Sequence, residues 1–286
     1  MDSCILVKQI AQTVVVNGST SSAVEVTSGV PQGTVLGPLL FLCYINDLPT
    51  RVKSQVRLFA DDCLLYRSIA SVTDALQLQE DLTALEIWAE EWKMHFNPTK
   101  CYVMRMHRSR SPIITPYSLC NHVLDLHTTN PYLGVLLSDD AKWSPHIDKM
   151  CNKANSTLGF LRMNLSNCPT QLKELSYIAL VQSKLKYAAC VWNPHLAKDV
   201  KKIEAVQRRS ARFVTRNYNW DQSVTELIKE LGWESLETRR TNASLTMLYK
   251  IVNNEVAIKI NEHLERSTSL TRKKKHYTIQ THQHKH

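Results

Sequence analysis

Two adjacent aspartates, Asp61 and Asp62, interrupt an apolar stretch over residues 56–66. Adjacent acidic residues are usually solvated, but two charges in an apolar setting are costly unless they are paired or metal-bound. The stretch predicts two strands joined by a tight turn, which would project both carboxylates into a cleft while the strands stay packed. Mg²⁺ would relieve the repulsion between them, because it prefers a few carboxylate oxygens together with substrate phosphates. The residues alone therefore suggest a magnesium site without requiring one.

The same chain contains two other acidic pairs, and their contexts favour simpler roles. Asp139-Asp140 comes just before a predicted helix start, where a turn and a favourable helix N-terminal charge explain it. Glu90-Glu91 falls on a predicted helix and is expected to be a solvated face. The apolar neighbours, rather than the acidity, therefore set Asp61-Asp62 apart.

Composition bounds the class of protein. The chain has 286 residues, is 43% hydrophobic, and carries 35 Lys+Arg against 26 Asp+Glu, a net charge of +9. This balance favours a polyanionic partner, nucleic acid or an acidic membrane surface, although an ordinary basic soluble protein fits composition equally well. No apolar run approaches the ~20 residues that span a bilayer, and the N-terminus lacks signal-peptide features. We therefore expect no membrane association and an intracellular location, nuclear or cytoplasmic.

The eight cysteines support the same view of the compartment. They are scattered singly, and no CxxC motif or Cys/His cluster has the spacing of zinc ligands. We expect reduced, mostly buried thiols.

Periodicity divides the chain into a mixed part up to about residue 138 and a helical part beyond it. The mixed part predicts a hairpin with a six-residue loop, a buried helix, a helix opened by a capping box at Ser71-Val72-Thr73-Asp74 and ended at Asn97-Pro98, and three short strands. These elements fall at residues 12–16 with 23–26, 35–46, 71–97, 101–106, 123–126 and 132–137.

The helical part begins at Ser144-Pro145, which is typical of an N-cap followed by proline in the first turn. Helical patterns cover residues 146–165, 170–191, 199–217, 224–231 and 235–253. Beyond residue 254 the periodicity fades, and the basic end is expected to be disordered. Trp88, Trp92, Trp192 and Trp233 are predicted to be core residues rather than stacking platforms.

Several ordered sequence blocks carry a family resemblance. Residues 28–41 are SGVPQGTVLGPLLF, residues 44–49 are YINDLP, residues 59–62 are FADD, residues 96–101 are FNPTKC and residues 132–135 are YLGV. This series resembles the reverse transcriptases of non-LTR retrotransposons over most of residues 12–254. Arg239-Arg240 and Tyr249-Lys250-Ile251 resemble the C-terminal extension of jockey- and LINE-like elements. The order and spacing of the blocks argue against chance agreement.

The resemblance implies a role for each matching residue. Asp61 and Asp62 would bind the catalytic Mg²⁺ ions, and Lys100 would lie near the triphosphate as a positive charge or proton donor. The template base and incoming nucleotide would lie near Pro31, Gln32, Gly33, Phe59 and Ala60. The primer terminus would be held by Tyr132, Leu133 and Gly134. Simpler interpretations are an ordinary turn at residues 31–33 and a buried strand with a tight turn at residues 132–134.

The implied reaction is two-metal nucleotidyl transfer with an RNA template, a DNA primer or duplex, and dNTPs. Reverse transcriptases supply a further metal-binding aspartate from a block upstream of the PQG block. Asp2 is the only aspartate before residue 12, and the sequence around it does not match that block. The resemblance therefore predicts an N-terminally truncated, incomplete active site with little or no polymerase activity from this chain alone.

We expect an α+β fold: a partial palm with an antiparallel sheet at residues 1–138, thumb-like helices at 139–195, a helical C-terminal extension at 196–262 and a basic disordered tail at 263–286. The alternative is a non-catalytic, basic nucleic-acid-binding remnant of a decayed element. Oligomeric state is not predicted. Cations on the predicted helices would contact backbone phosphates or form a solvated face. They are Lys149, Lys153, Arg162, Lys198, Lys201, Lys202, Arg208, Arg209, Arg212 and Arg216.

Overall fold

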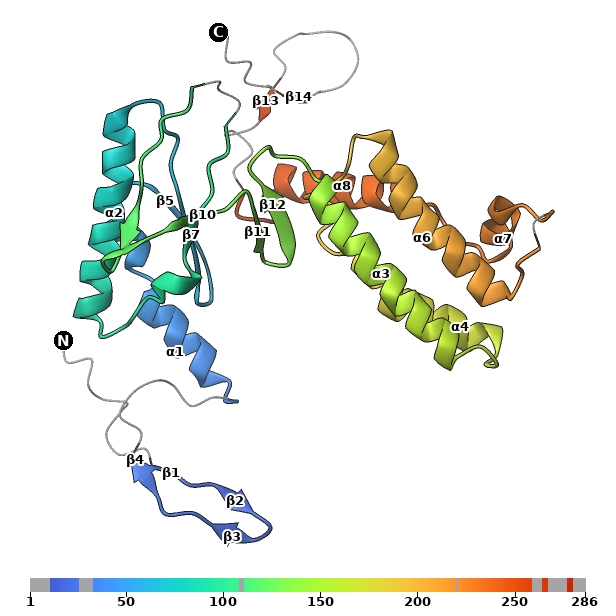
Figure 1. Ribbon diagram of the computed structural model, residues 1–286, viewed down its shortest axis with the longest axis horizontal. Helices are drawn as coiled ribbons and strands as arrows, with labels where there is room; N and C mark the ends of the chain where they lie inside the picture. Colours follow the sequence, from blue (N-terminus) through green and yellow to red (C-terminus); the bar gives the residue numbers. More distant parts are fainter. Residues whose placement is uncertain are drawn as a thin grey trace. The chain divides into compact units, whose positions relative to one another are not determined.

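The computed structural model describes residues 11–25, 33–107, 111–219 and 221–258, together with two short strands nearer the C-terminus. The chain forms two compact units. The first comprises residues 1–103 and 109–126, and the second comprises residues 104–108 and 127–286. Helices and small sheets occur in the mixture expected of an α+β protein (Figure 1), so this part of the prediction is confirmed.

The chain starts, in the described residues, with the predicted hairpin. Ala11–Gln12 (β1) pairs with Val24–Glu25 (β4), and Val15–Val16 (β2) pairs with Ser19–Thr20 (β3). Asn17 and Gly18 have φ of 49° and 83°, as a two-residue hairpin turn requires. The predicted six-residue loop was therefore wrong, because the Asn-Gly turn lets the strands pair up to its edges.

The helix Leu36–Ile45 (α1) lies where it was predicted, but it is not buried. Leu36, Leu39 and Leu42 are 63%, 57% and 52% exposed, whereas Ile45 is 4% exposed. This correction has a simple cause: the helix is apolar on most faces, and only the face carrying Phe41 and Ile45 joins the core of the first unit.

That core lies between a long helix and a hairpin. Gln55–Phe59 (β5) pairs antiparallel with Asp62–Tyr66 (β6), and Val72–Glu91 (α2) supplies Leu85, Trp88 and Ala89 to the cluster. The capping box is confirmed, since Ser71 Oγ accepts from Asp74 N at 3.2 Å and Asp74 Oδ2 accepts from Ser71 N at 2.9 Å. The helix ends before Asn97-Pro98, which instead begins the short 3₁₀ helix Pro98–Lys100 (η2). A second 3₁₀ turn, Leu48–Arg51 (η1), follows α1.

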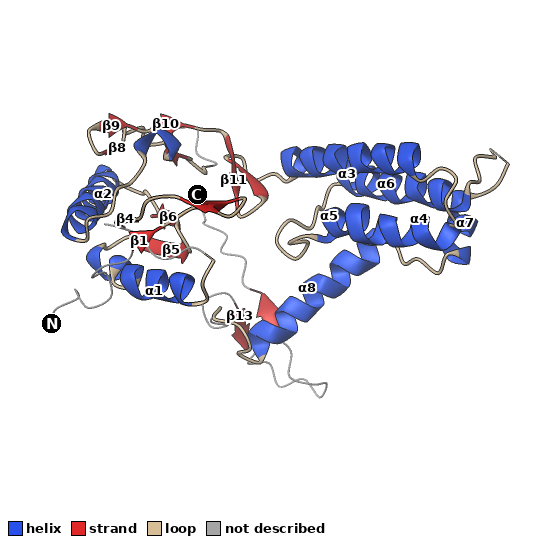
Figure 2. Ribbon diagram, turned by 90° about the horizontal axis from the view of Figure 1, so that it is seen from below, coloured by secondary structure: helices blue, strands red, loops and turns tan. Residues whose placement is uncertain are grey.

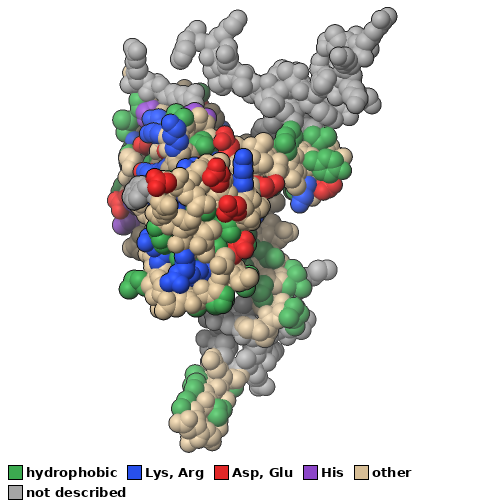
Figure 3. Space-filling view, turned by 90° about the vertical axis from the view of Figure 1, so that its right-hand side faces the viewer, with side chains coloured by type: hydrophobic (Ala, Val, Ile, Leu, Met, Phe, Trp, Pro, Cys, Tyr) green, Lys and Arg blue, Asp and Glu red, His purple; other side chains and the backbone are tan. Residues whose placement is uncertain are grey.

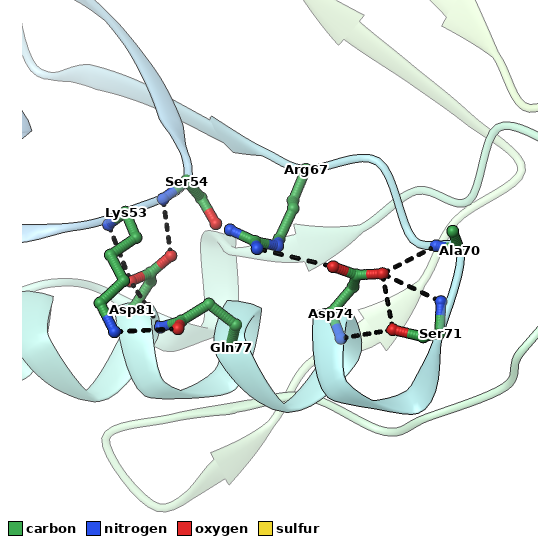
Figure 4. A network of polar contacts seen from close by, with 8 residues as sticks. All are labelled: Lys53, Ser54, Arg67, Ala70, Ser71, Asp74, Gln77 and Asp81. Carbon is green, nitrogen blue, oxygen red and sulfur yellow. Dashed lines mark hydrogen bonds and ion pairs between the residues drawn. The ribbon is translucent and has the colours of Figure 1, made fainter.

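A buried carboxylate fastens this helix to the start of β5. Asp81, 3% exposed, accepts hydrogen bonds from Lys53 N at 3.0 Å and Ser54 N at 2.8 Å (Figure 4). Gln77 bridges the same group, donating to Asp81 at 3.4 Å and accepting from Lys53 Nζ at 3.1 Å. Burial alone would raise the pKa of Asp81, but the hydrogen bonds from Ser54 and Lys53 outweigh it and hold the pKa below its ordinary value.

The remaining strands of the first unit are short. Tyr102–Val103 (β7) pairs in parallel with Asp125–Leu126 (β10), and Ser118–Leu119 (β8) pairs with His122–Val123 (β9). Strands are thus confirmed near residues 102 and 125, though shorter than predicted. Every sheet in the described chain has two strands, so the expected antiparallel sheet is present there only as separate pairs.

The second unit joins one hairpin to a set of packed helices. Thr129–Tyr132 (β11) pairs with Val135–Ser138 (β12). The helices are Ser144–Asn164 (α3), Thr170–Tyr177 (α4), Ser183–Lys186 (α5), Ala197–Thr215 (α6), Val224–Glu230 (α7) and Leu236–Val252 (α8). They confirm the predicted helices, except that the one expected over residues 170–191 contains a π-helical segment, Ile178–Gln182 (η3), and ends early. Both ribbon views show α3 and α6 side by side (Figure 2).

Aromatic residues fill the cores as predicted. Trp88 is 1%, Trp192 0% and Trp233 9% exposed, while Trp92 is partly buried. The cysteine prediction was only half right: those in the described chain are free, but Cys151 alone is buried. No helix among the described residues is long and apolar enough to cross a membrane. In the tail expected to be disordered, Leu264–Arg266 (β13) pairs with Tyr277–Ile279 (β14).

The Asp81 network generates a stability prediction. Asp81→Ala leaves two backbone N–H groups without an acceptor and should lower the free energy of unfolding by about 2–4 kcal/mol. Because the pKa of Asp81 is lowered on folding, its stabilisation is present at neutral pH and is lost as pH falls below the ordinary carboxyl range. Urea denaturation from pH 3 to 7 measures both effects.

The matched control is Glu80→Ala, the exposed neighbour on the same helix. It should change stability by less than about 0.5 kcal/mol. Equal effects of the two substitutions would show that the network does not hold β5 to α2.

Candidate functional site

The Asp61-Asp62 pair lies at the turn of the β5–β6 hairpin. Phe59 pairs with Asp62 and Leu58 with Cys63, so Ala60 and Asp61 form a two-residue turn and Asp62 begins β6. Ala60 has φ of 50°, a left-handed conformation that costs a non-glycine residue about 1–2 kcal/mol. The backbone is therefore held in a strained turn beside the carboxylates.

The strands position this turn by burying one face. Val56 is buried and Leu58 and Leu65 are partly buried against the α2 core, whereas Arg57 and Phe59 alternate outward. Asp61 and Asp62 are themselves exposed. Because the turn leaves both carboxylates exposed, the free-energy cost of burying two charges does not arise.

The pair's donor set suits one kind of metal site. Among the described residues there is no group of three His, Cys, Asp or Glu side chains that could hold a metal. Mg²⁺ bound together with substrate phosphates needs only one or two carboxylates and keeps several waters. Asp61 and Asp62 fit that arrangement and do not fit an all-protein cage.

Lys100 lies in the same unit as the carboxylates. It is the last residue of η2 and is exposed, and its backbone N–H donates to Asn97 O at 3.0 Å. Desolvation raises the pKa of the Cys63 thiol to about 11, and the nearby Cys101 thiol adds to the rise. Cys63 follows Asp62 and Cys101 follows Lys100, so this electrostatic influence links the residues next to the two predicted segments.

The nucleotide-binding residues predicted from the PQG block are only partly within the described chain. Pro31 and Gln32 lie outside the described residues. Gly33 has φ of 81° and no atom within 4 Å of where a Cβ would stand, so its conformation, not its surroundings, calls for glycine. Phe59, at the end of β5, is 60% exposed.

The predicted primer-holding residues form the tip of the β11–β12 hairpin in the second unit. Tyr132 pairs with Val135, leaving Leu133 and Gly134 as the turn with φ of 46° and 79°. Tyr187 donates its hydroxyl hydrogen to Leu133 O at 2.9 Å, and a Cβ on Gly134 would stand 3.1 Å from Tyr187 Cε1. A tyrosine after α5 therefore fixes this turn from the side.

His146 fixes the same hairpin from another direction. Its Nδ1 accepts from Leu136 N at 3.1 Å. Burial lowers the pKa of His146 and the charge of Lys149 lowers it further, which favours the neutral imidazole that this acceptor role requires. Nothing in the sequence indicated Tyr187, because its contact joins residues 54 positions apart.

The predicted cations on α3 and α6 are partly used within the unit. Lys202 forms an ion pair with Asp148, Arg209 Nε donates to Asn155 Oδ1 at 3.3 Å, and Arg212 donates to Asn219 O at 2.9 Å. Figure 3 shows Lys and Arg side chains in separate groups with Asp and Glu between them. On that face the positive charge is distributed and does not form one continuous strip.

Comparison with known proteins agrees with the motif blocks. Residues 1–137 match the family model described as reverse transcriptase (RNA-dependent DNA polymerase). The chain is 30% identical over 204 residues to a probable RNA-directed DNA polymerase from transposon BS of Drosophila melanogaster, covering 66% of this chain and 22% of that protein. It is 27% identical over 241 residues to the RNA-directed DNA polymerase from mobile element jockey of the same species, covering 79% of this chain and 26% of that protein.

A third relative, a probable RNA-directed DNA polymerase from transposon X-element of Drosophila melanogaster, is 27% identical over 232 residues, 75% of this chain and 24% of that protein. The protein belongs to the reverse transcriptase family. Within that family it is of the jockey- and LINE-like kind, as its motifs predicted. It spans about a quarter of the length of these relatives.

The β11–β12 turn generates a prediction with a control inside the chain. Gly134→Ala should destabilise the second unit through both its positive φ and the contact with Tyr187, by about 1–3 kcal/mol. Gly18→Ala meets the same φ problem, with φ of 83°, but nothing within 4 Å. It should cost about 1–2 kcal/mol from the backbone alone, less than Gly134→Ala, which adds the contact with Tyr187.

Urea denaturation compares the two substitutions, with Tyr187→Phe as a third variant that should cost about 1 kcal/mol by removing the hydroxyl donor. Combining Gly134→Ala with Tyr187→Ala should recover part of the loss, since the clashing ring is gone. If the double variant lost the sum of both effects, the contact between ring and turn would not be the cause.

Proposed function

We propose that this chain carries the metal-binding hairpin of an enzyme for RNA-templated DNA synthesis. The observation that carries the proposal is the position of Asp61 and Asp62, which are exposed at a two-residue turn inside the segment that matches the reverse transcriptase family. Such a turn presents two carboxylates to a ligand while its strands stay packed.

Each matching residue has a proposed role. Asp61 and Asp62 hold Mg²⁺, which when bound activates the primer hydroxyl and stabilises the leaving pyrophosphate. Lys100, exposed in the same unit as the two aspartates, supplies positive charge to the nucleotide phosphates. The template base and incoming dNTP contact Pro31, Gln32, Gly33, Phe59 and Ala60, and the primer end contacts Tyr132, Leu133 and Gly134.

The domain assignment follows the same proposal. Residues 1–138 are a partial palm, 139–195 thumb-like helices, 196–262 a helical C-terminal extension and 263–286 a basic tail. Fixing the 132–134 turn by Tyr187 and His146 gives the proposed primer contact a rigid base. RNA template and DNA primer are the partners, and the enzyme acts inside the cell.

The same geometry supports low activity of the isolated chain. Two carboxylates give Mg²⁺ fewer protein ligands than a three-aspartate site, and the described residues provide no third ligand beside them. The second candidate function, a non-catalytic nucleic-acid-binding protein, is favoured by this observation together with the net charge of +9.

Metal binding tests the proposed role of the pair directly. With dNTP present, Mn²⁺ binding followed by electron paramagnetic resonance should weaken at least about tenfold in the double variant Asp61→Asn, Asp62→Asn, because the charge-assisted ligands are lost. The control is Glu90→Gln, Glu91→Gln, an exposed acidic pair of the same unit, which should leave binding unchanged. Equal Mn²⁺ affinity of the two double variants would show that Asp61 and Asp62 do not bind the metal.

Primer extension separates the two functions. With Mg²⁺, an RNA template and a DNA primer, the chain alone should extend the primer weakly or not at all while still binding the duplex. Extension that disappears in the Asp61→Asn, Asp62→Asn variant would establish a polymerase and overturn the expected inactivity. Duplex binding without metal-dependent nucleotide binding would establish the non-catalytic alternative.

A further inference from the structure

The second unit contains a cationic pocket that the proposed polymerase chemistry does not use. Its volume is about 260 Å³, and it is lined by Arg162, Ser166, Lys173, Phe213, Arg216 and Tyr218. These residues come from the end of α3, the loop after it, α4, and the end of α6 with the segment that follows. Three of the six carry positive charge and none carries negative charge.

Lys173 is the unusual member of this set. Its side chain is 1% exposed, and its Nζ lies 5.8 Å from the centroid of the Phe213 ring. Within the described parts of the chain, no carboxylate pairs with it and no side-chain hydrogen bond reaches it. An ammonium group buried beside an aromatic ring, without an anion, is costly. Burial lowers its pKa and Arg216 lowers it further, with Cys168 acting in the opposite sense.

The two arginines line the same pocket and are more exposed. Arg162 lies over the Tyr218 ring, with Cζ 5.5 Å from its centroid, and Arg216 donates to Asn167 Oδ1 at 3.4 Å. These contacts position the guanidinium groups but use few of their five N–H donors. Neither arginine has a carboxylate partner in the chain that the structure describes. Their remaining donors are therefore available to an anion.

We propose that this pocket binds a phosphate monoester, the terminal phosphate of a nucleotide or of an RNA end. A monoester carries a charge of about −1.5 to −2 at neutral pH and several acceptor oxygens, which matches three cations and the Ser166 hydroxyl. It enters with its free oxygens first, so it reaches the buried Lys173. An internal phosphodiester is bonded to a sugar on each side. To reach Lys173 it would have to bring both flanking nucleosides into the pocket.

The shape of the rim agrees with a nucleotide ligand. Tyr218 is 49% exposed, so part of its ring is open to stack against a base, a contact that any base can make. Phe213 is buried, belongs to the core of the unit and also lines the pocket. The phosphate thus pairs with the cations while the attached nucleoside stays toward the solvent.

Thermal unfolding of the full chain tests the phosphate site. Inorganic phosphate should raise the melting temperature relative to chloride at equal ionic strength. Lys173→Met removes the buried charge while keeping a side chain of similar shape, so it should raise the melting temperature without phosphate and abolish the phosphate-dependent rise. Lys229→Gln, which removes an exposed charge from α7 outside the pocket, should keep the rise.

RNA binding identifies the source of the phosphate. A short single-stranded RNA with a 5′-phosphate should bind about tenfold more tightly than the same RNA with a 5′-hydroxyl, since charge-assisted hydrogen bonds are gained. Arg162→Gln and Lys173→Met should remove this preference, and Lys229→Gln should keep it. If inorganic phosphate stabilises the chain but RNA ends are not distinguished, the ligand is a free phosphate or nucleotide.

Two results would overturn the proposal. One is a wild-type chain whose melting temperature does not change with inorganic phosphate and whose affinity for RNA does not change with a 5′-phosphate. The other is a phosphate-dependent rise that persists unchanged in Lys173→Met. If Lys173→Met fails to fold, Arg162→Gln and Arg216→Gln, both at exposed positions, provide the same comparison.

Discussion

The geometry of the two-residue hairpin turn underlies the proposed metal site and the proposed primer contact. Four antiparallel pairs in the described chain are joined this way, at Asn17-Gly18, Ala60-Asp61, Cys120-Asn121 and Leu133-Gly134. Right-handed strand twist requires positive φ at such turns, and all four have it at their first residue. Asparagine and glycine adopt this conformation at little cost. Ala60, like Cys120 and Leu133, does not, so at the carboxylate pair the packed strands must hold the backbone in a strained form.

Polar contacts with the rest of each unit then stabilise these short hairpins in one position. An isolated two-stranded hairpin is marginal in water. The β5–β6 hairpin is anchored by its apolar face and by the hydrogen bonds from residues 53 and 54 to Asp81. The β11–β12 hairpin is anchored by Tyr187 and His146. In each case a buried side chain from a helix, Asp81 or His146, accepts hydrogen bonds from backbone N–H groups of the strand segment. A turn held from both sides can present residues with little loss of conformational entropy on binding.

The outcome of the sequence predictions follows from the range of the interactions involved. Helix periodicity and capping are local, so the helices of the second unit and the capping box at Ser71 were predictable. The motif blocks identified the family and located Asp61-Asp62 at a turn. Burial of α1 was predicted wrongly, because apolar composition does not say whether a covering surface is present. Asp81, Tyr187 and Lys173 were missed, since their partners lie 27 or more residues away or in another helix.

The two candidate sites pose the same electrostatic problem with opposite signs. At the hairpin turn, exposed carboxylates repel one another but remain solvated, so a metal held by them alone would be weakly bound. Substrate phosphates that share the metal would supply the missing ligands. In the helical unit, a buried ammonium lacks an anion, and a phosphate would supply that directly. At the turn the missing countercharge is a metal ion whose other ligands are phosphate oxygens, and in the helical unit it is the phosphate itself. Affinity at each site therefore depends on the ligand's charge more than on its shape. A chain with this arrangement would distinguish phosphorylated from unphosphorylated ligands at two separate positions.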